Sequence, residues 1–260
     1  MAIRLALLVV LLGPLACADD ADRLPSEEVK LGGDARKLCF RLGPLPGAKE
    51  PKEGFGLLVI LPGGDGGADF NMFCRRILIH GAGEGYVGIQ LVAPKWTETQ
   101  PIVWPTATNK VEGMKFTTEE FVEEAIADAR KWKGIDPERI FVLVWSSSGP
   151  AAYALSLRKD STPVGYFIAM SVFKPAELGD LGGARGQAYF LYHSADDRVC
   201  PFRMAEEAEK KLSKERAKVK LQTYAGGHGW HGNMYGDMRA GVAWLEENRR
   251  KATRIRGKAR

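Results

Sequence analysis

The sequence has few of the residues that bind metals or cross-link a chain. It contains four cysteines and four histidines in 260 residues, and their spacing matches no zinc-binding pattern. We therefore expect no metal and no other cofactor. If Cys17 leaves with an export signal, Cys39, Cys74 and Cys200 remain, so at least one thiol is free. One disulfide among these three is compatible with an oxidising compartment, but the sequence does not select its partners.

Long apolar runs are also scarce. The apolar run Leu5–Leu12 is too short to span a bilayer, so we expect no transmembrane segment. Arg4 precedes this run, and Ala16-Cys17-Ala18 follows it with small residues at the spacing of a cleavage site. We predict a signal peptide over residues 1–18 and export to the periplasm or the medium. The alternatives are a buried N-terminal helix and a lipid anchor on Cys17, which would hold the protein at a membrane.

Positive charge is concentrated at the end of the chain. The formal net charge is +5, but Arg249–Arg260 holds seven basic residues and no acidic one, which leaves −2 for the rest. A basic tail can contact nucleic acid or an anionic surface. A solvated terminus is the simpler interpretation, so we expect no nucleic-acid partner. Because no linker-like segment divides the remainder, we predict one domain over 19–248 and a disordered tail over 249–260.

Apolar runs alternate with amphipathic segments along most of the chain. The runs are continuous rather than alternating in polarity, as in parallel strands that are covered on both faces. This order predicts a three-layer α/β/α sandwich with a mostly parallel sheet. The expected strands are Leu38–Leu42, Gly56–Leu61, Val87–Ala93, Ile140–Val144, Val164–Ala169, Ala188–His193 and Val219–Tyr224.

Capping residues indicate where one of the helices begins. Thr117-Thr118-Glu119-Glu120 forms a capping box, and an apolar stripe runs from there to Trp132. We expect Gly134 to end this helix in a left-handed conformation and Asp136-Pro137 to turn the chain into the next strand. Two further amphipathic helices are expected at 202–212 and 236–247.

A serine-rich turn follows the expected strand Ile140–Val144 and precedes an apolar, alanine-rich segment. Strand, sharp serine-bearing turn and helix is the context of a nucleophile elbow, in which small residues usually lie two before and two after the serine. Ser146 places Val144 and Ser148 there, whereas Ser147 places a bulky indole there. We therefore predict Ser146 as the nucleophile, with Ser147 and a purely structural serine-rich helix cap as alternatives.

A serine hydroxyl needs a base that removes its proton and a carboxylate that orients the base. Where the serine lies on a strand–turn–helix elbow, the chain order is serine, acid, histidine. That order discards His80 and His193 and leaves His228 and His231. His228 is closer to the last strand and lies between glycines that let the backbone double back, so it is preferred. The Asp196-Asp197 pair follows a strand and is either an ordinary turn or the source of the acid.

Three segments resemble those of a known family. Residues 136–142 resemble the D-P-x-R-hydrophobic approach to the serine in secreted esterases of the feruloyl-esterase and polyester-depolymerase kind, and the alignment reaches Ser146 without a gap. Residues 193–201 resemble the H-G-x-x-D-x-x-V-P segment of many α/β hydrolases, with Ser194 in place of glycine and Cys200 in place of valine. Residues 62–67 resemble the H-G-G-G loop of esterases, with proline in place of histidine.

The resemblance implies an α/β-hydrolase fold and assigns the remaining site residues. Asp197 matches the triad acid, with Asp196 as the alternative. The backbone N–H groups of Gly64 and Ser147 would form the oxyanion hole. Fewer than 60 residues separate Ser146 from Asp197, and they are needed for sheet and helix, so no large lid domain is expected.

The resemblance also implies an exported serine esterase that acts on a small-molecule or polymeric ester. A peptidase or thioesterase on the same scaffold, or a non-catalytic relative that binds ligands, is the competing interpretation. The long loop from Lys95 to Lys115 carries Trp96, Trp104 and Pro105. These rings either wall an acyl or aryl pocket or pack over the core, and Trp104 is our candidate substrate-binding residue.

Overall fold

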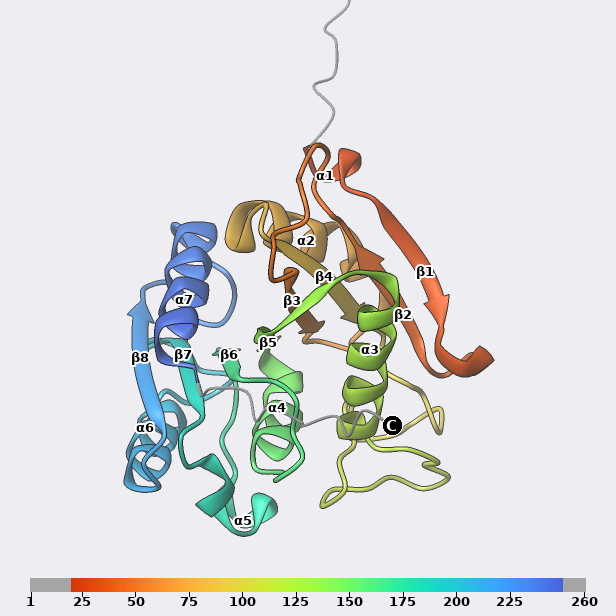
Figure 1. Cartoon of the computed structure of the whole chain (residues 1–260). Coiled ribbons are helices and arrows are strands. Elements are labelled where there is room, and N and C mark those ends of the chain that lie inside the picture. Colours follow the sequence, from red (N-terminus) through yellow and green to blue (C-terminus); the bar gives the residue numbers. More distant parts are fainter. Residues whose placement is uncertain (1–19, 250–260) are drawn as a thin grey trace, which may run out of the picture.

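A computed structural model describes residues 20–249 (Figure 1). The predicted signal peptide, the alternative lipid site at Cys17 and all but the first residue of the predicted basic tail lie outside the described residues. Within the described range, no helix has the length and apolar character needed to cross a bilayer.

An eight-stranded sheet runs through the centre of the molecule in the order β1-β2-β4-β3-β5-β6-β7-β8. The pairs β1–β2 and β2–β4 are antiparallel, and the other neighbours are parallel. The strands are β1 Ser26–Lys30, β2 Leu38–Leu42, β3 Phe55–Leu61, β4 Tyr86–Leu91, β5 Ile135–Trp145, β6 Gly165–Ala169, β7 Ala188–Ser194 and β8 Lys218–Tyr224.

Helices cover both faces of this sheet. The α-helices are α1 Asp20–Arg23, α2 Asn71–Arg76, α3 Thr118–Trp132, α4 Gly149–Ser156, α5 Pro175–Leu178, α6 Arg203–Lys214 and α7 Met234–Asn248. Shorter or irregular helical segments are η1 Leu31–Gly33, η2 Ala68–Phe70, the π-helical η3 Ile77–Ala82, η4 Ser146–Ser148 and η5 Leu181–Ala184.

The two layers of helices bury opposite sides of the same strands. In β3, Leu57 and Val59 pack into the core below α3, α4 and α6, whereas Leu58 and Ile60 pack against α2, η3 and α7. Figure 1 shows these two groups of helices separated by the sheet. Because both faces are covered, every residue of β3 is buried, which explains its continuous apolar sequence. The predicted three-layer α/β/α sandwich is confirmed.

The predicted strands are all present, and the local turn prediction needs one correction. The capping box at Thr117 begins α3 as expected. Gly134, however, does not take the left-handed conformation, because the backbone is already extended at Lys133, where α3 ends. Asp136-Pro137 lies within β5, as part of an irregular stretch between the paired residues Ile135 and Ile140. There the Asp136 carboxylate accepts the N–H of Glu138, so the expected turn chemistry occurs inside the strand.

The connections after β4 and β6 shape the surface near the expected site. Residues 92–117 form a long irregular segment between β4 and α3. The segment between β6 and β7 holds the short helices α5 and η5, and the described chain contains no lid domain. Cys39, Cys74 and Cys200 are buried as free thiols, so the structure forms no disulfide among them.

Candidate active site

The nucleophile candidate lies at the sharp turn between β5 and α4. Ser146 follows the last residue of β5 and has a φ of 55°. This left-handed conformation costs a residue with a side chain about 1–2 kcal/mol. Neighbouring contacts must therefore hold it in place, as they do in the strained turns of functional sites.

Two buried hydroxyls hold this turn. Ser148 Oγ donates to the carbonyl of Leu61 at 2.7 Å and accepts the N–H of Trp145 at 3.1 Å, so it ties the turn to the end of β3. Ser171 Oγ, just after β6, donates to the carbonyl of Ser146 at 2.6 Å. A Cβ added at Gly149 would lie 1.9 Å from Ser171 Oγ, so the close approach of α4 to this segment requires glycine. Ser148 does not bond an amide of α4, which excludes the simple helix cap for its side chain.

The loop after β8 brings a histidine to the serine. Ser146 Oγ and His228 Nε2 are 3.0 Å apart, which is hydrogen-bonding distance. Gly226, Gly227 and Gly229 all have positive φ values, so the loop reverses direction in a way that glycine permits. The alternative base, His231, is exposed and lies against Tyr224.

Asp197, in the loop after β7, holds the other side of this imidazole. Its Oδ2 lies 2.8 Å from His228 Nδ1, and its Oδ1 accepts the backbone N–H groups of Val199 and Cys200, each at 2.8 Å. Burial disfavours the charged carboxylate, but the bonds from His228 and the two amides outweigh that effect and lower the pKa of Asp197. The acid therefore stays ionised. Its alternative, Asp196, is exposed.

A second histidine, which the chain-order argument discarded, also contacts the acid. His193 Nε2 lies 3.2 Å from Asp197 Oδ2 and 2.8 Å from the carbonyl of Cys200, and its side chain is 2% exposed. Burial lowers the pKa of His193, although the Cys200 carbonyl and the Asp197 carboxylate act to raise it. The imidazole is therefore neutral, and its Nε2–H lies between these two oxygen acceptors. The sequence signal was present: His193 is the histidine of the H-G-x-x-D pattern, four residues before the acid.

Ser194, which replaces the glycine of that pattern, joins the acid loop to the histidine loop. Its Oγ accepts the N–H of Asp196 at 3.2 Å and the N–H of Gly227 at 3.0 Å. Both loops therefore share one buried hydroxyl. Nothing in the sequence alone pointed to this contact, because it depends on β7 and β8 being neighbours.

The two amides expected in an oxyanion hole belong to adjacent loops. Ser147 Oγ donates to the carbonyl of Gly64 at 2.8 Å, which ties the turn after β5 to the glycine-rich loop after β3. Gly64 has a φ of 60°. Trp104 supports the same loop, because its Nε1 donates to the carbonyl of Pro62 at 2.9 Å and its ring is 1% exposed.

A cavity of about 210 Å³ opens beside Ser147. It lies between the 101–109 segment, the start of α4 and the residues around α5. Its walls are mainly apolar, with Lys174 and Glu177 as an ion pair at 3.2 Å. Trp104 thus both packs on the core and lines the cavity, while Trp96 instead packs edge-on against Phe116. The lining includes Val103, Trp104, Asn109, Ser147, Pro150, Tyr153, Val172 and Leu178.

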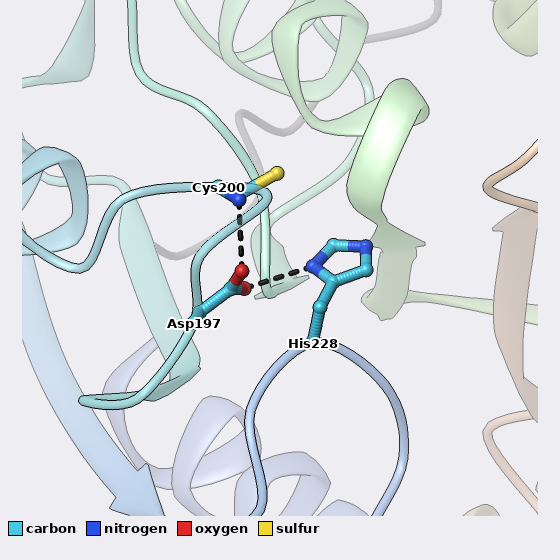
Figure 2. A group of neighbouring side chains, drawn as sticks. All are labelled: Asp197, Cys200 and His228. Atoms are coloured by element: carbon cyan, nitrogen blue, oxygen red, sulfur yellow. Dashed lines mark hydrogen bonds and ion pairs between the residues drawn. The ribbon is translucent and has the colours of Figure 1, made fainter.

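One group of side chains in the described part of the chain has donors suited to a metal ion. Asp197, Cys200 and His228 each offer a ligand atom, and these atoms lie within 4.8 Å of one another (Figure 2). The Cys200 thiol is buried, and burial together with the Asp197 charge raises its pKa to about 11. It is therefore protonated at neutral pH when no metal is bound.

Comparison with known proteins rests on structure. No protein-family model matches the sequence, and no curated protein matches it. An α/β hydrolase from a Medee basin deep-sea metagenome library superposes with a TM-score of 0.64 at 14% identity, covering 86% of this chain and 97% of that one. A Bacillus cereus carboxylesterase gives 0.55 at 16% identity, covering 77% and 92%.

A third similar structure is Thermogutta terrifontis esterase 2 phosphonylated by sarin. Its TM-score is 0.60 at 14% identity, with 85% of this chain and 93% of that one covered. At this level of identity the likeness concerns the fold. Together with the sheet order and the turn at Ser146, it shows that the chain has the α/β-hydrolase fold.

Proposed function

We propose that the protein is a serine hydrolase that cleaves carboxylic esters through an acyl-enzyme intermediate on Ser146. The observation that carries this proposal is the continuous hydrogen-bonded series from Ser146 Oγ through both nitrogens of His228 to the buried carboxylate of Asp197. This arrangement matches the nucleophile, base and orienting acid of serine hydrolases in distance, order and burial.

The contacts support a role for each group. The carboxylate of Asp197 keeps the His228 proton on Nδ1, so Nε2 presents its lone pair to the Ser146 hydroxyl. As Ser146 Oγ attacks the ester carbonyl, His228 Nε2 takes its proton and then donates it to the departing alcohol oxygen. Water repeats the sequence on the acyl-enzyme. The imidazolium that forms at each step is stabilised by the ionised acid.

The developing oxyanion needs donors on the side away from the histidine. The backbone N–H groups of Gly64 and Ser147 are our candidates, since the bond between Ser147 Oγ and the Gly64 carbonyl keeps their two loops together. Each such donor typically contributes about 10²–10³ in kcat. Trp104 supports this arrangement indirectly through its bond to Pro62.

The cavity beside Ser147 is the candidate binding site for either the acyl or the alcohol part of the ester. Its volume of about 210 Å³ is below the roughly 300–1,000 Å³ of typical drug-sized sites. We therefore infer a substrate with a short acyl chain or a single ring on that side. Two of the similar structures are those of a carboxylesterase and an esterase, which supports the same chemistry here.

A fluorophosphonate probe tests the nucleophile directly. Wild-type protein should be labelled covalently, whereas Ser146→Ala should not be labelled and should lose roughly 10⁵–10⁶ in kcat. Ser147→Ala is the matched control, because it removes the adjacent hydroxyl and keeps the backbone amide; loss of its bond to the Gly64 carbonyl should slow labelling without abolishing it. Labelling that survives in Ser146→Ala and disappears in Ser147→Ala would contradict the assignment. A panel of nitrophenyl esters and aminoacyl nitroanilides then separates esterase from peptidase activity.

We also propose that the enzyme is exported. The charge at Arg4, the apolar run Leu5–Leu12 and the small residues around Cys17 support this. Mass spectrometry of protein expressed with its full sequence should find a mature chain that begins at Asp19. A diacylglyceryl group on Cys17 would instead identify a membrane-anchored lipoprotein.

A further inference from the structure

Cys200 takes no part in the proton transfers proposed above, yet its side chain lies at the catalytic acid and base. Its Sγ, a carboxylate oxygen of Asp197 and a ring nitrogen of His228 are all within 4.8 Å of one another. Figure 2 shows the sulfur extending toward the side on which the imidazole lies. Thiol, imidazole and carboxylate are the three side-chain types that bind zinc in proteins.

Small shifts of the three side chains would give the spacing of a tetrahedral metal site. Zinc lies about 2.0–2.3 Å from such ligands, so the ligand atoms of a tetrahedral site are roughly 3.3–3.7 Å apart. The His228 Nδ1 to Asp197 Oδ2 separation of 2.8 Å must therefore open slightly, and the separations from Cys200 Sγ, which are at most 4.8 Å, must fall within the same range. The Asp197 carboxylate is already oriented by two backbone amides and by His193, as metal-binding carboxylates usually are.

An ion can reach this group from solvent on the histidine side. The His228 side chain is 23% exposed, whereas that of Asp197 is fully buried. Three protein ligands would leave a fourth position for water. Hard ions such as Mg²⁺ and Ca²⁺ prefer oxygen ligands, so a thiol and an imidazole select Zn²⁺ or Cd²⁺ instead.

We propose that Asp197, Cys200 and His228 form an inhibitory site for Zn²⁺ and similar soft divalent ions. Binding replaces the hydrogen bond at His228 Nδ1 with a metal–nitrogen bond, so the proton leaves Nδ1 and the neutral imidazole carries its single proton on Nε2 instead. Cys200 forms a metal–thiolate bond and releases its proton to solvent. With Nε2 protonated, His228 cannot accept the proton of Ser146, so the nucleophile is not activated. The inhibitory effect, though not the binding, rests on the proposed hydrolase function.

Inhibition kinetics provide the first test. Protein cleared of metal with EDTA is titrated with ZnCl₂ or MgCl₂ while initial rates on a nitrophenyl ester are followed. We expect zinc to lower kcat reversibly, EDTA to restore it and magnesium to have no effect. For each protein we compare the zinc concentration that halves its own zinc-free rate. In Cys200→Val this concentration should be at least roughly tenfold higher than in wild type, because even residues that only support a metal ligand change metal affinity by about 10–100-fold. His231→Gln, a histidine of the same loop, should leave it unchanged.

Metal binding without catalysis provides the second test. Titration of the full chain with CdCl₂ should produce the ultraviolet charge-transfer absorption of a cadmium thiolate, and Cys200→Val should lose that absorption. If this signal is present but no ester is cleaved even without metal, the site stands and the proposed hydrolase function fails. If the absorption or the zinc sensitivity is the same in Cys200→Val as in wild type, the proposed site is overturned.

Discussion

Replacing Asp197 with asparagine is the most informative single change at this site. One carboxylate oxygen accepts two N–H groups, from Val199 and Cys200, and the other faces His228 Nδ1 with His193 Nε2 nearby. An amide in this position must turn its oxygen toward the two backbone donors. Its NH₂ group then faces His228 and donates where the carboxylate accepted. The structure therefore selects one amide orientation, and that orientation reverses the hydrogen bond to the histidine.

The reversed bond changes the tautomer of His228. Nδ1 must accept, so the proton moves to Nε2, and Nε2 donates to Ser146 Oγ instead of accepting from it. Loss of the correct tautomer in a serine triad lowers kcat by about 10⁴, which is about 5.5 kcal/mol at 1.36 kcal/mol for each factor of ten. We expect a loss of about 10³–10⁴ in kcat/KM for a nitrophenyl ester. The fold should persist because the amide keeps both backbone contacts.

The neighbouring carboxylate provides the matched control. Asp196 is exposed and contributes its backbone N–H rather than its side chain to the contact with Ser194. Asp196→Asn should therefore keep kcat/KM within a factor of two or three of wild type, as is usual for exposed positions away from the chemistry. The reasoning is refuted if Asp197→Asn stays within about tenfold of wild type while circular dichroism and thermal melting show an intact fold.

Replacing Ser148 with alanine should lower the free energy of unfolding in urea by about 2–4 kcal/mol, because buried groups of Leu61 and Trp145 lose their partner; a change below about 0.5 kcal/mol would contradict this. His193 has a lowered pKa, so the unfolded chain binds its proton first and stability should fall as the pH drops below about 6.5. Urea unfolding at several pH values should show that the free energy of unfolding depends less on pH in His193→Phe than in wild type. An unchanged pH dependence would exclude His193 as its cause. Val172→Phe narrows the cavity and should raise KM for an aryl ester more than for an acetate; equal changes would place the substrate elsewhere.

The central strands could be predicted from the sequence because a strand that is buried on both faces is apolar along most of its length. Strands β3, β4, β6 and β7 and the second half of β5 are mostly apolar in sequence, and the structure confirms them. The edge strand β1 has the sequence Ser-Glu-Glu-Val-Lys and is mostly exposed, so no apolar pattern marked it. Its position depends on pairing with β2, which is a long-range contact that periodicity does not contain.

The site residues that lie within a single distinctive loop could be predicted from the sequence. The contacts between two loops could not. Ser146 and His228 stand out because a serine turn follows one strand and a glycine-rich loop follows another. Asp197 required the resemblance to α/β hydrolases, since an aspartate pair after a strand is also an ordinary turn. His193 was discarded by chain order, although its place four residues before the acid brings it back against that carboxylate. Ser194 acts through β7–β8 pairing, which only the fold reveals.

The hydrogen bonds of Ser148, Ser171 and Ser194 divide the proposed catalytic groups between two parts of the protein. The turn at Ser146 is anchored to β3 and to the end of β6, in the middle of the sheet. The acid and histidine loops share the Ser194 hydroxyl and follow β7 and the edge strand β8. Small fluctuations at this end of the sheet would carry Asp197 and His228 together and alter their distance from the serine. Mild heat or denaturant would thus uncouple the nucleophile from an intact acid–base pair, and activity would disappear reversibly before the sheet unfolds.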